Sequence, residues 1–495
     1  YRHRSDRRLH VYLTNSLESP ADERTLFDQL FSEEAEAANR VKRDAPVMVM
    51  MGNPPYNGAS RNKGEWIMNL MRTYKMEPGG QTPLKERNPK WLNDDYVKFI
   101  RLAHYYIERT GTGIVAFINP HGYLDNPTFR GMRWQLLRTF DRIYTIDLHG
   151  NSKKHETAPD GSKDENVFDI QQGVSINLFI RTQEKHDRDH MADVYHYDLY
   201  GLRSDKYNFL DSHSLADIPF QRLAPQPPMY FFVPKDFTVE AEYKKGFGVN
   251  ELFNICILGP NSHRDHFAIA FTQEEATQRI NDLLNTDKTN EELRKEYQLK
   301  DNRDWKLNEA RQGLKGNEKA VECLYRPFDR RYMLYGSFAF DYLRPQLNDH
   351  LLQPNYALLY TKQTKELFSC FVTDRPLGQH KIVTPYDGSY ASPLFLYKED
   401  DTSPVPNFRP EVVAQIERGL GEKVEPLELF DYVYAVLYSP RYRERYREML
   451  RIDFPRVPYP ADAAAYHQLA DIGARLRRTH LMEDAEGWPP GMTYP

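Results

Sequence analysis

The sequence predicts an α/β protein in two parts: a partial Rossmann-like, doubly wound sheet of mostly parallel strands, followed by an α+β region. Three observations predict this. Short apolar runs alternate with amphipathic helical stretches up to about residue 180. Short links join these elements, as in the repeating units of a parallel sheet. Beyond about residue 222 the composition changes, and short strand-like runs rich in tyrosine, phenylalanine and arginine follow.

The first part holds the alternating elements. Its helices are indicated by apolar residues at helical spacing, and its strands by continuous apolar runs. A polar loop over 58–93, long enough to suggest a substrate-facing function, interrupts them. In chain order we expect a short strand over 9–13, a helix over 22–43, a buried strand over 48–52, a helix over 94–110, a strand over 114–118, a helix over 128–139, and strands over 142–148 and 174–180.

A proline-rich stretch, Ala-Pro-Gln-Pro-Pro at 224–228, marks the change in composition. It is typical of a linker, and the alternative is a rigid loop within one domain. Placing the boundary there gives parts 1–225 and 226–495. In the second part we expect strands over 253–258, 356–360 and 395–397, and helices over 272–284 and 290–299.

Composition limits the class of protein. The 495 residues, with 13% aromatic and 28% charged residues, suffice for about two to four globular domains. No apolar run is long enough to span a bilayer and no signal-peptide pattern is present, so we expect no membrane partner. The net charge of −5 is no signature of nucleic-acid binding. It does not exclude such binding, because a local basic face matters more than the sum.

No metal site is indicated by the cysteines or histidines. Cys256, Cys323 and Cys370 lie far apart, as expected for free thiols in a reducing cytoplasm, and they provide no zinc framework. His263 and His266 have no second ligand pair near them in the sequence, so we expect surface histidines there.

The most informative feature is where the apolar run Met48–Gly52 ends, on Asn53-Pro54-Pro55-Tyr56. Neither proline donates to a sheet, so the strand ends there. A stiff loop then follows at a strand's carboxyl end, where open α/β sheets place their ligands. It presents an amide, proline carbonyls and an aromatic ring, which are the parts needed to hold a planar amine-bearing ring. The alternative is an ordinary turn.

Met-Gly-Asn-Pro-Pro-Tyr resembles the catalytic motif of amino-methyltransferases, most often those that methylate adenine N6 in DNA. The resemblance implies that Asn53 Oδ1 and the Pro54 carbonyl accept from the adenine amino group, with Pro55 stiffening the loop. The nitrogen lone pair then points at the methyl group of S-adenosylmethionine, the implied cofactor. Tyr56 would stack on a base swung out of duplex DNA, a contact worth about 1–3 kcal/mol.

Further segments in both halves resemble the Type ISP restriction–modification enzymes of bacteria and archaea. The resemblance implies a methyltransferase domain over 1–225 and a DNA target-recognition domain over 226–495. It also implies nuclease and helicase modules elsewhere on the same polypeptide, and a cytoplasmic location. The segments are 113–124, 146–154, 164–174, 325–331, 430–440, 442–447 and 453–458.

The glycine-rich loop that holds the cofactor in amino-methyltransferases is missing upstream of Asn53. Gly111-Thr112-Gly113 does not replace it, because these glycines close a helix and open a strand, whereas cofactor glycines follow a strand. The chain also begins with Tyr1. We therefore expect an N-terminally truncated chain, without assignable cofactor residues, that is inactive as an isolated fragment.

Other candidate residues each have a second interpretation. Phe168 corresponds to a base-holding position in the family pattern, and the alternative is a core phenylalanine. Lys153 and Lys154 are candidates for phosphate contacts or are ordinary surface lysines. Arg326, Arg330 and Arg331 surround Phe328 and Tyr332, which suits phosphates and bases, unless they form an arginine–carboxylate network around Asp329. Arg443 belongs to a run of alternating arginines that is a DNA-binding candidate or a solvated helix.

Three functions follow. The favoured one is an adenine-N6 DNA methyltransferase within a restriction–modification system, acting on double-stranded DNA by base flipping. A second enzyme hypothesis is protein-glutamine or RNA methylation, since such enzymes also use Asn-Pro-Pro-Tyr, although they usually have little chain after the motif. The third is a DNA-specificity module without catalysis, which the missing cofactor loop favours.

Overall fold

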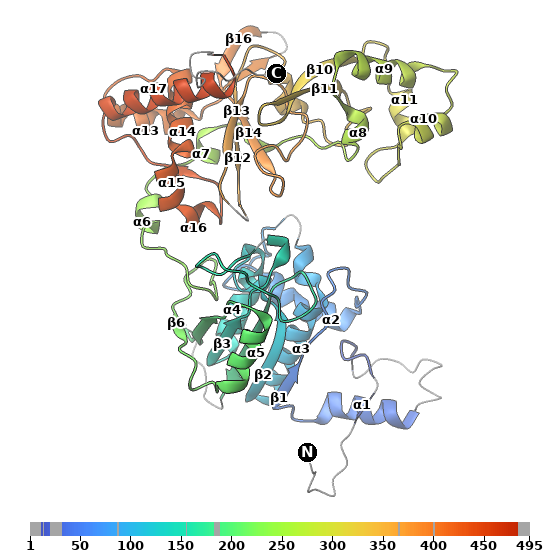
Figure 1. Ribbon diagram of the computed structural model, residues 1–495, viewed down its shortest axis with the longest axis vertical. Helices are drawn as coiled ribbons and strands as arrows, with labels where there is room; N and C mark the ends of the chain where they lie inside the picture. The colour runs from blue at the N-terminus through green and yellow to red at the C-terminus, as the bar shows by residue number, and fades with distance from the viewer. Residues whose placement is uncertain are drawn as a thin grey trace, which may run out of the picture. The chain divides into compact units, whose positions relative to one another are not determined.

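The computed structural model describes residues 11–12, 14–19, 32–86, 89–154, 156–182, 189–364, 367–398 and 401–483, without the side chains of 32–35, 154 and 401–402. The chain divides into two compact units, Tyr1–Lys235 and Asp236–Pro495 (Figure 1). The sequence placed this division at the proline-rich stretch, after residue 225. No helix among the described residues is both long and apolar enough to cross a membrane.

A six-stranded mixed sheet forms the centre of the N-terminal unit, in the order β1-β2-β4-β3-β5-β6. The pairs β1–β2 and β3–β5 are parallel. Strand β4 runs antiparallel to both β2 and β3, and β6 runs antiparallel to β5. The strands are β1 (Val49–Gly52), β2 (Gly113–Pro120), β3 (Arg142–Asp147), β4 (Val174–Arg181), β5 (Asp193–Asp198) and β6 (Gln221–Leu223).

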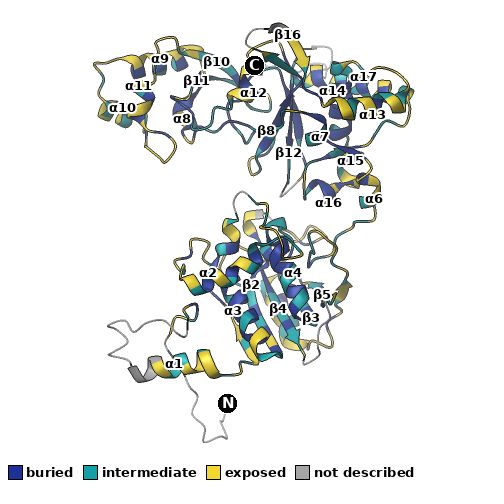
Figure 2. Ribbon diagram, turned by 180° about the vertical axis from the view of Figure 1, so that it is seen from behind, coloured by how far each residue is buried: buried dark blue, intermediate teal, exposed yellow. Residues whose placement is uncertain are grey.

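Helices cover both faces of this sheet, so its inner strands are largely buried (Figure 2). On one face, residues of α3 and α4 such as Ile100 and Met132 pack with Phe117 and Phe179 of the strands. On the other face, Phe209 of α5 packs against a cluster that includes Ile146 of β3. The helices are α1 (Ser32–Asp44), α2 (Glu65–Met71), α3 (Asp95–Thr110), α4 (Arg130–Thr139) and α5 (Arg203–Ser212).

The predicted α/β class is confirmed, and so are the helices and strands expected between residues 94 and 180. The sheet is mixed: β1, β2, β3 and β5 run in one direction, as the mostly parallel prediction requires, whereas β4 and β6 run in the other. Between β3 and β4 the described residues contain only the short 3-10 helix Ser152–Lys154 and no α-helix, and the chain returns beside β3 in the opposite direction rather than crossing over a face. The polar loop expected over 58–93 contains helix α2, which buries Ile67 and Met71. The expected strand over 9–13 and helix residues 22–31 lie mainly outside the described residues.

Strand β1 is not buried, contrary to the prediction. It is one of the two edge strands of the described sheet, with β6 at the other edge, and it pairs with β2. The side chains of Met48, Val49 and Met51 are 54%, 63% and 81% exposed. An apolar edge strand with open hydrogen-bonding groups is a template for pairing with further chain.

The C-terminal unit combines antiparallel sheets with helices, as expected for an α+β region. One sheet has the order β10-β11-β9 and another the order β13-β12-β14-β8. The strands are β7 (Phe247–Gly248), β8 (Ile257–Leu258), β9 (Ile269–Ala270), β10 (Lys319–Arg326), β11 (Asp329–Tyr335), β12 (Ala357–Thr361), β13 (Cys370–Thr373), β14 (Ser389–Pro393), β15 (Phe395–Lys398), β16 (Asp401–Pro406) and β17 (Arg456–Val457).

The predicted helices at 272–284 and 290–299 correspond to α9 and α10. Both begin at a threonine cap: Thr272 Oγ1 accepts from the Glu275 amide, and Thr289 Oγ1 from the Glu292 amide. The strand expected over 253–258 is reduced to β8. The helices are α6 (Glu240–Tyr243), α7 (Val249–Leu252), α8 (Asp265–Ala268), α9 (Gln273–Leu284), α10 (Asn290–Glu296), α11 (Leu307–Gln312), α12 (Pro345–Leu351), α13 (Pro410–Leu420), α14 (Pro426–Tyr438), α15 (Pro440–Arg445), α16 (Arg447–Leu450) and α17 (Ala463–His480).

Helices α14 and α17 pack closely in the largest core cluster of this unit. Gly473 permits the close approach, because a Cβ there would lie 1.9 Å from the Asp431 carbonyl oxygen. One turn further, Arg477 Nε donates to Asp431 Oδ1 at 2.8 Å and Nη2 donates to Oδ2 at 3.0 Å. Backbone contact and a bidentate ion pair thus fix the same helix crossing.

We predict that Gly473→Ala lowers the free energy of unfolding of the C-terminal unit by roughly 1–3 kcal/mol, because the added methyl group overpacks the helix crossing. Urea unfolding followed by circular dichroism measures the change. Gly419→Ala in α13 is the matched control, since a Cβ there meets nothing within 4 Å. Equal stability of the two variants would contradict the packing account.

Candidate functional site

The Asn53-Pro54-Pro55-Tyr56 loop begins directly after β1, as predicted. Asn53 and Pro55 are exposed, Pro54 is buried and Tyr56 is half-buried. The Tyr56 hydroxyl donates to Asn53 Oδ1 at 2.6 Å, and it lies 3.2 Å from the Ile118 carbonyl oxygen of β2. The motif is therefore closed on itself and tied to the neighbouring strand, with the Asn53 side chain open to solvent.

Tyr56 packs at the junction of the two core clusters on either face of the sheet. Its ring meets that of Tyr96 edge to face, with centroids 6.5 Å apart. Burial raises the pKa of Tyr56 to about 12. The Tyr56 phenol therefore stays protonated and donates a hydrogen bond at neutral pH. This bond orients the Asn53 side-chain amide through its Oδ1 atom.

The first turn of α3 holds the far end of the loop. Asp94 caps this helix by accepting from the Tyr96 amide at 3.4 Å, and the same oxygen accepts from the Asn57 amide at 2.9 Å. The Asp95 amide donates to the Asn57 carbonyl at 3.3 Å. Burial raises the pKa of Asp94, against the lowering effect of these amides. One capping carboxylate thus serves both the helix and the loop.

A buried polar cluster continues this support. Ser60 Oγ donates to Asp95 Oδ1 at 2.5 Å, and Lys98 Nζ donates to Ser60 Oγ at 2.6 Å and to the Asn62 carbonyl at 2.5 Å. Lys98 is 1% exposed, and burial lowers its pKa. Sequence reasoning did not identify these residues. Two consecutive aspartates ahead of an amphipathic helix are a capping signal, and that signal would have found Asp94.

Another Asn-Pro pair, Asn119-Pro120 at the end of β2, is part of the interior. Asn177 Nδ2 donates to Asn119 Oδ1 at 3.0 Å, and the Tyr123 hydroxyl donates to Asn177 Oδ1 at 2.7 Å. All three side chains are buried. Their hydrogen bonds are made within the protein, so this pair positions strands rather than a ligand.

The loop between β3 and β4 is attached to the sheet by a histidine–carboxylate network. His121 Nδ1 lies 2.9 Å from Asp147 Oδ1. His149 Nδ1 lies 3.0 Å from Glu156 Oε1, and its Nε2 lies 2.8 Å from Asp198 Oδ1. Burial alone would lower the pKa of His149, but the bonds to Asp198 and Glu156 outweigh it and raise the pKa to about 10.

These groups lie close enough to hold a cation in two combinations, His121 with His149 and Glu156, and Asp147 with His149 and Asp198. However, each His149 nitrogen already faces a carboxylate. A doubly protonated imidazole has no lone pair for a metal. The cluster is therefore an ionic clamp on the loop, with His149 as the bridging cation.

A second clamp on this loop is a fully buried ion pair. Lys206 Nζ of α5 donates to Asp164 Oδ1 at 2.7 Å, and both side chains are 0% exposed. Lys206 also donates to the Leu148 carbonyl at 2.6 Å, while Asp164 Oδ2 accepts from the Gly150 amide at 2.6 Å. Since both charges have additional partners, the pair satisfies the conditions under which a buried ion pair is tolerated.

The clamped loop carries Phe168. Its amide donates to Asn166 Oδ1 at 2.9 Å, and Asn166 Nδ2 donates to the Gly150 carbonyl at 3.1 Å. The half-buried Phe168 ring packs against the same apolar cluster as Tyr56. The two candidate base-holding rings therefore share one supporting cluster. Lys153 is exposed in the same loop, whereas the Lys154 side chain lies outside the described residues.

Comparison with known families identifies the C-terminal unit. Residues 251–495 match the family described as the Type ISP C-terminal specificity domain. The C-terminal unit belongs to this family. The Type ISP resemblance that the motifs predicted is thus confirmed for this C-terminal region. No curated protein sequence matches the chain.

Solved structures show the same fold over 97% of this chain. It is similar to a DrdV–DNA complex (TM-score 0.75, 22% identity). It is also similar to the ATP-dependent Type ISP enzyme LlaBIII bound to DNA (0.73, 21%) and to a nuclease-deletion mutant of the Type ISP enzyme LlaGI with a DNA substrate mimic (0.71, 20%). The chain spans 48%, 33% and 39% of those three chains.

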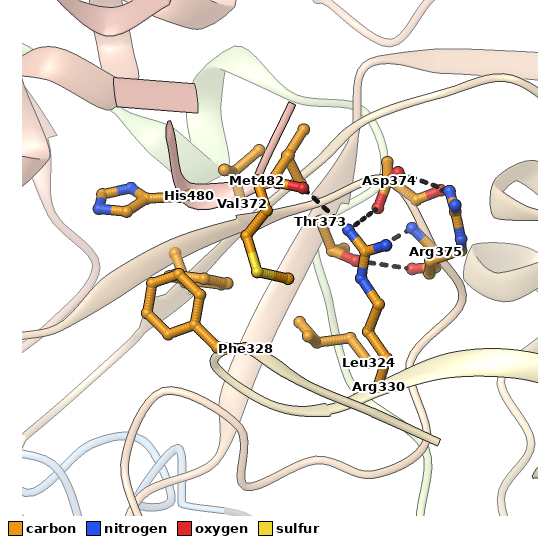
Figure 3. A pocket seen from close by; sticks show the side chains of 11 residues that line it. Leu324, Phe328, Arg330, Val372, Thr373, Asp374, Arg375, His480 and Met482 are labelled. Carbon is orange, nitrogen blue, oxygen red and sulfur yellow. Dashed lines mark hydrogen bonds and ion pairs between the residues drawn. The ribbon is translucent and has the colours of Figure 1, made fainter. Parts of the chain in front are cut away.

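In the specificity domain, Arg330 is used internally. It lies beside a small hollow at the β10–β11 turn that is lined by Phe328, His480 and Met482 (Figure 3). Arg330 Nη2 donates to the Leu481 carbonyl at 2.9 Å. This guanidinium therefore ties the hairpin to the residues that follow α17.

The other predicted arginines are also engaged. Arg331 donates to Asp329 through Nε at 2.9 Å and Nη2 at 2.8 Å, which is the arginine–carboxylate contact considered as the alternative. Arg443 Nε donates to the Leu437 carbonyl at 2.8 Å and its guanidinium lies over the Tyr438 ring. Arg326 contacts the Tyr325 ring and carbonyl. A DNA contact by any of these arginines stays a prediction.

His263 and His266, the two histidines expected at the surface, are exposed. His263 pairs with Asp341, and His266 Nε2 lies 3.0 Å from the Tyr297 carbonyl oxygen. The three cysteines are free thiols.

The His149 clamp predicts how stability depends on pH. Because folding raises the pKa of His149 from 6.5 to about 10, its stabilisation is complete below pH 6.5 and is lost as pH rises toward 10. We therefore expect the free energy of unfolding of the N-terminal unit to fall over this interval, and His149→Gln to flatten the fall. Urea titrations across the interval measure it.

His213→Gln, which changes an exposed histidine just after α5, is the control for this experiment. Asp198 and Glu156 do not contribute to the fall between pH 6.5 and 10. Their hydrogen bonds from His149 hold the pKa of each carboxyl below its usual value despite burial, so both are ionised throughout this interval. A His149→Gln profile parallel to that of the unchanged protein would exclude the clamp.

Proposed function

We propose that this chain is the catalytic-loop portion and the target-recognition domain of an adenine-N6 DNA methyltransferase within a Type ISP restriction–modification enzyme. One observation carries the proposal. An exposed Asn53 stands at the carboxyl end of a sheet strand, and the Tyr56 hydroxyl turns its Oδ1 into position at 2.6 Å. The specificity-domain match supports DNA as the substrate.

The chemistry required of Asn53 is that of a hydrogen-bond acceptor. A carbonyl oxygen has two lone pairs, so Oδ1 can accept from Tyr56 and from an adenine amino group at once. Accepting from that amine draws its lone pair out of the ring and makes the nitrogen nucleophilic. The Tyr56 bond also fixes the orientation of the amide group, so that no reorganisation accompanies substrate binding.

S-adenosylmethionine is the methyl donor in this proposal. The described residues do not fit as its complete binding site. Gly111, with φ 87°, is the C-cap of α3, and Gly113 opens β2, so these glycines do not form a loop between a strand and the helix after it. In this proposal the described residues act on the target base, and further chain of the enzyme supplies the cofactor loop.

The exposed edge of β1 supports a larger enzyme. Apolar side chains on an unpaired edge strand are normally covered. We propose that preceding chain of the same polypeptide pairs with this edge and brings the cofactor loop beside Asn53. Such a polypeptide also has room for the nuclease and helicase modules implied by the family resemblance, given that this chain spans 33% of LlaBIII.

A DNA-specificity module without catalysis is the second candidate, because the cofactor loop is absent from the described residues. The two candidates differ in one outcome. The methyltransferase labels adenine when the parent polypeptide is supplied with the cofactor, whereas a specificity module binds duplex DNA without labelling it.

To test the proposal, the parent enzyme is incubated with tritiated S-adenosylmethionine and duplex DNA, and the nucleosides are analysed. We expect label in N6-methyladenine. Asn53→Ala should reduce the rate about 100-fold or more, as for loss of a preorganised polar group in a transition state. Tyr56→Ala should reduce it roughly 5- to 150-fold, the equivalent of about 1–3 kcal/mol of stacking.

Asn208→Ala is the matched control, an exposed asparagine on α5 of the same unit. It should keep the parent rate. Label in protein or RNA would favour the second enzyme hypothesis, and full activity of Asn53→Ala would exclude the proposed chemistry.

A further inference from the structure

Phe271 projects from the specificity domain at the junction between β9 and α9. It is 71% exposed, the highest value among the large apolar side chains described in the C-terminal unit. The position of its backbone is fixed, since the Phe271 amide donates to Glu275 Oε2 at 3.0 Å. The Phe271 side chain is therefore exposed on a backbone that is fixed at the start of a capped helix.

The Phe271 ring rests on a guanidinium rather than in the core. The Cζ atom of Arg331 lies 4.4 Å from the Phe271 ring centroid and 4.0 Å from that of Tyr325. Arg331 is thus sandwiched between two aromatic rings that come from opposite sides of β11. Such contacts are favourable and directional.

Asp329 makes the stack rigid. It accepts from both Nε and Nη2 of Arg331, so the plane of the guanidinium is set by a two-point contact. The same contact neutralises Arg331. The stack of Tyr325, Arg331 and Phe271 consequently presents an apolar ring to solvent on a stiff support.

A guanidinium without a carboxylate partner among the described residues, that of Arg326, adjoins the stack. The Cζ atom of Arg326 lies 4.7 Å from the Tyr325 centroid, and Nη1 donates to the Tyr325 carbonyl at 3.0 Å. No carboxylate among the described residues forms an ion pair with Arg326, whereas Glu322 is paired with Arg375 at 2.8 Å. The surface therefore combines one flat apolar ring with one unneutralised guanidinium.

We propose that Phe271 is an apolar contact of the specificity domain in a groove of duplex DNA, and that Arg326 binds a neighbouring backbone phosphate. This inference rests on the proposed function. A phenylalanine ring suits thymine methyl groups or a partly opened base step. A guanidinium without a protein carboxylate suits a phosphate. A ring held on a fixed support loses little freedom on binding.

The direct test is photo-crosslinking by the full chain. The photoreactive analogue p-benzoylphenylalanine replaces Phe271, and the protein is irradiated with a labelled pool of duplexes that have a randomised central segment. We expect a covalent protein–DNA adduct. The same analogue at Leu284, an exposed apolar residue at the far end of α9, should form none, because about eleven residues of helix separate it from the start of α9.

Binding measurements separate the two roles. We expect Phe271→Ala to weaken binding of the same pool at least fivefold without changing its salt dependence, since the ring carries no charge. Arg326→Gln should weaken binding and lower the slope of log affinity against log salt by about one phosphate contact. Leu284→Ala should leave both quantities unchanged.

The outcomes distinguish this inference from the proposed function. If the unchanged chain binds duplex DNA but no adduct forms at position 271 and Phe271→Ala binds normally, the inference is overturned and the proposed function stands. That result would assign the stack to a protein contact instead. If the unchanged chain binds no duplex DNA at all, both this inference and the proposed function are overturned.

Discussion

The Asn53–Tyr56 loop cannot be held in place by sheet hydrogen bonds, because the two residues after Asn53 are prolines and have no amide hydrogen. Side chains replace the missing bonds. Tyr56 ties one end of the loop to Asn53 and to β2, and Asp94 ties the other end to the first turn of α3. The geometry of the candidate site therefore depends on a helix cap and a phenol, which lie at opposite ends of one short loop.

The same principle extends to the neighbouring loop after β3. Its described residues contain no α-helix, and His149 and the buried pair of Lys206 and Asp164 attach it to the sheet and to α5. A lone charge at either position would be strongly destabilising, whereas the paired and hydrogen-bonded arrangement is tolerated and has a definite geometry. That geometry places Phe168 on the cluster that supports Tyr56.

Arginine has a different structural use in the C-terminal unit. Protein carbonyl or carboxylate groups accept hydrogen bonds from Arg330, Arg331 and Arg443. The planar guanidinium groups of Arg331 and Arg443 also lie over aromatic rings, a contact that suits arginine better than lysine. The abundance of arginine next to tyrosine and phenylalanine thus has an internal explanation, and only the surface that remains unneutralised is available for phosphates.

Much of this could be predicted from the sequence. The local chemistry of Pro54 and Pro55 ends a strand whatever surrounds it, and apolar spacing at 3.6 residues marks α3 in any context. The family resemblance was read from residue types that recur in a specific order, and the family match includes the segments 325–331, 430–440, 442–447 and 453–458. The exposed position of Asn53 after β1 also followed from the motif alone.

What the sequence by itself determined was therefore the local elements, the family and the candidate motif. Only the tertiary structure decided the direction of β4, the exposure of β1 and the partners of the buried charges. The reason is physical, because strand direction and burial depend on which elements are neighbours across the sheet. An apolar run such as 48–52 has the same sequence pattern whether it forms an edge strand or a central strand. Ion pairs such as Lys206–Asp164 join residues 42 positions apart, and no local pattern marks them.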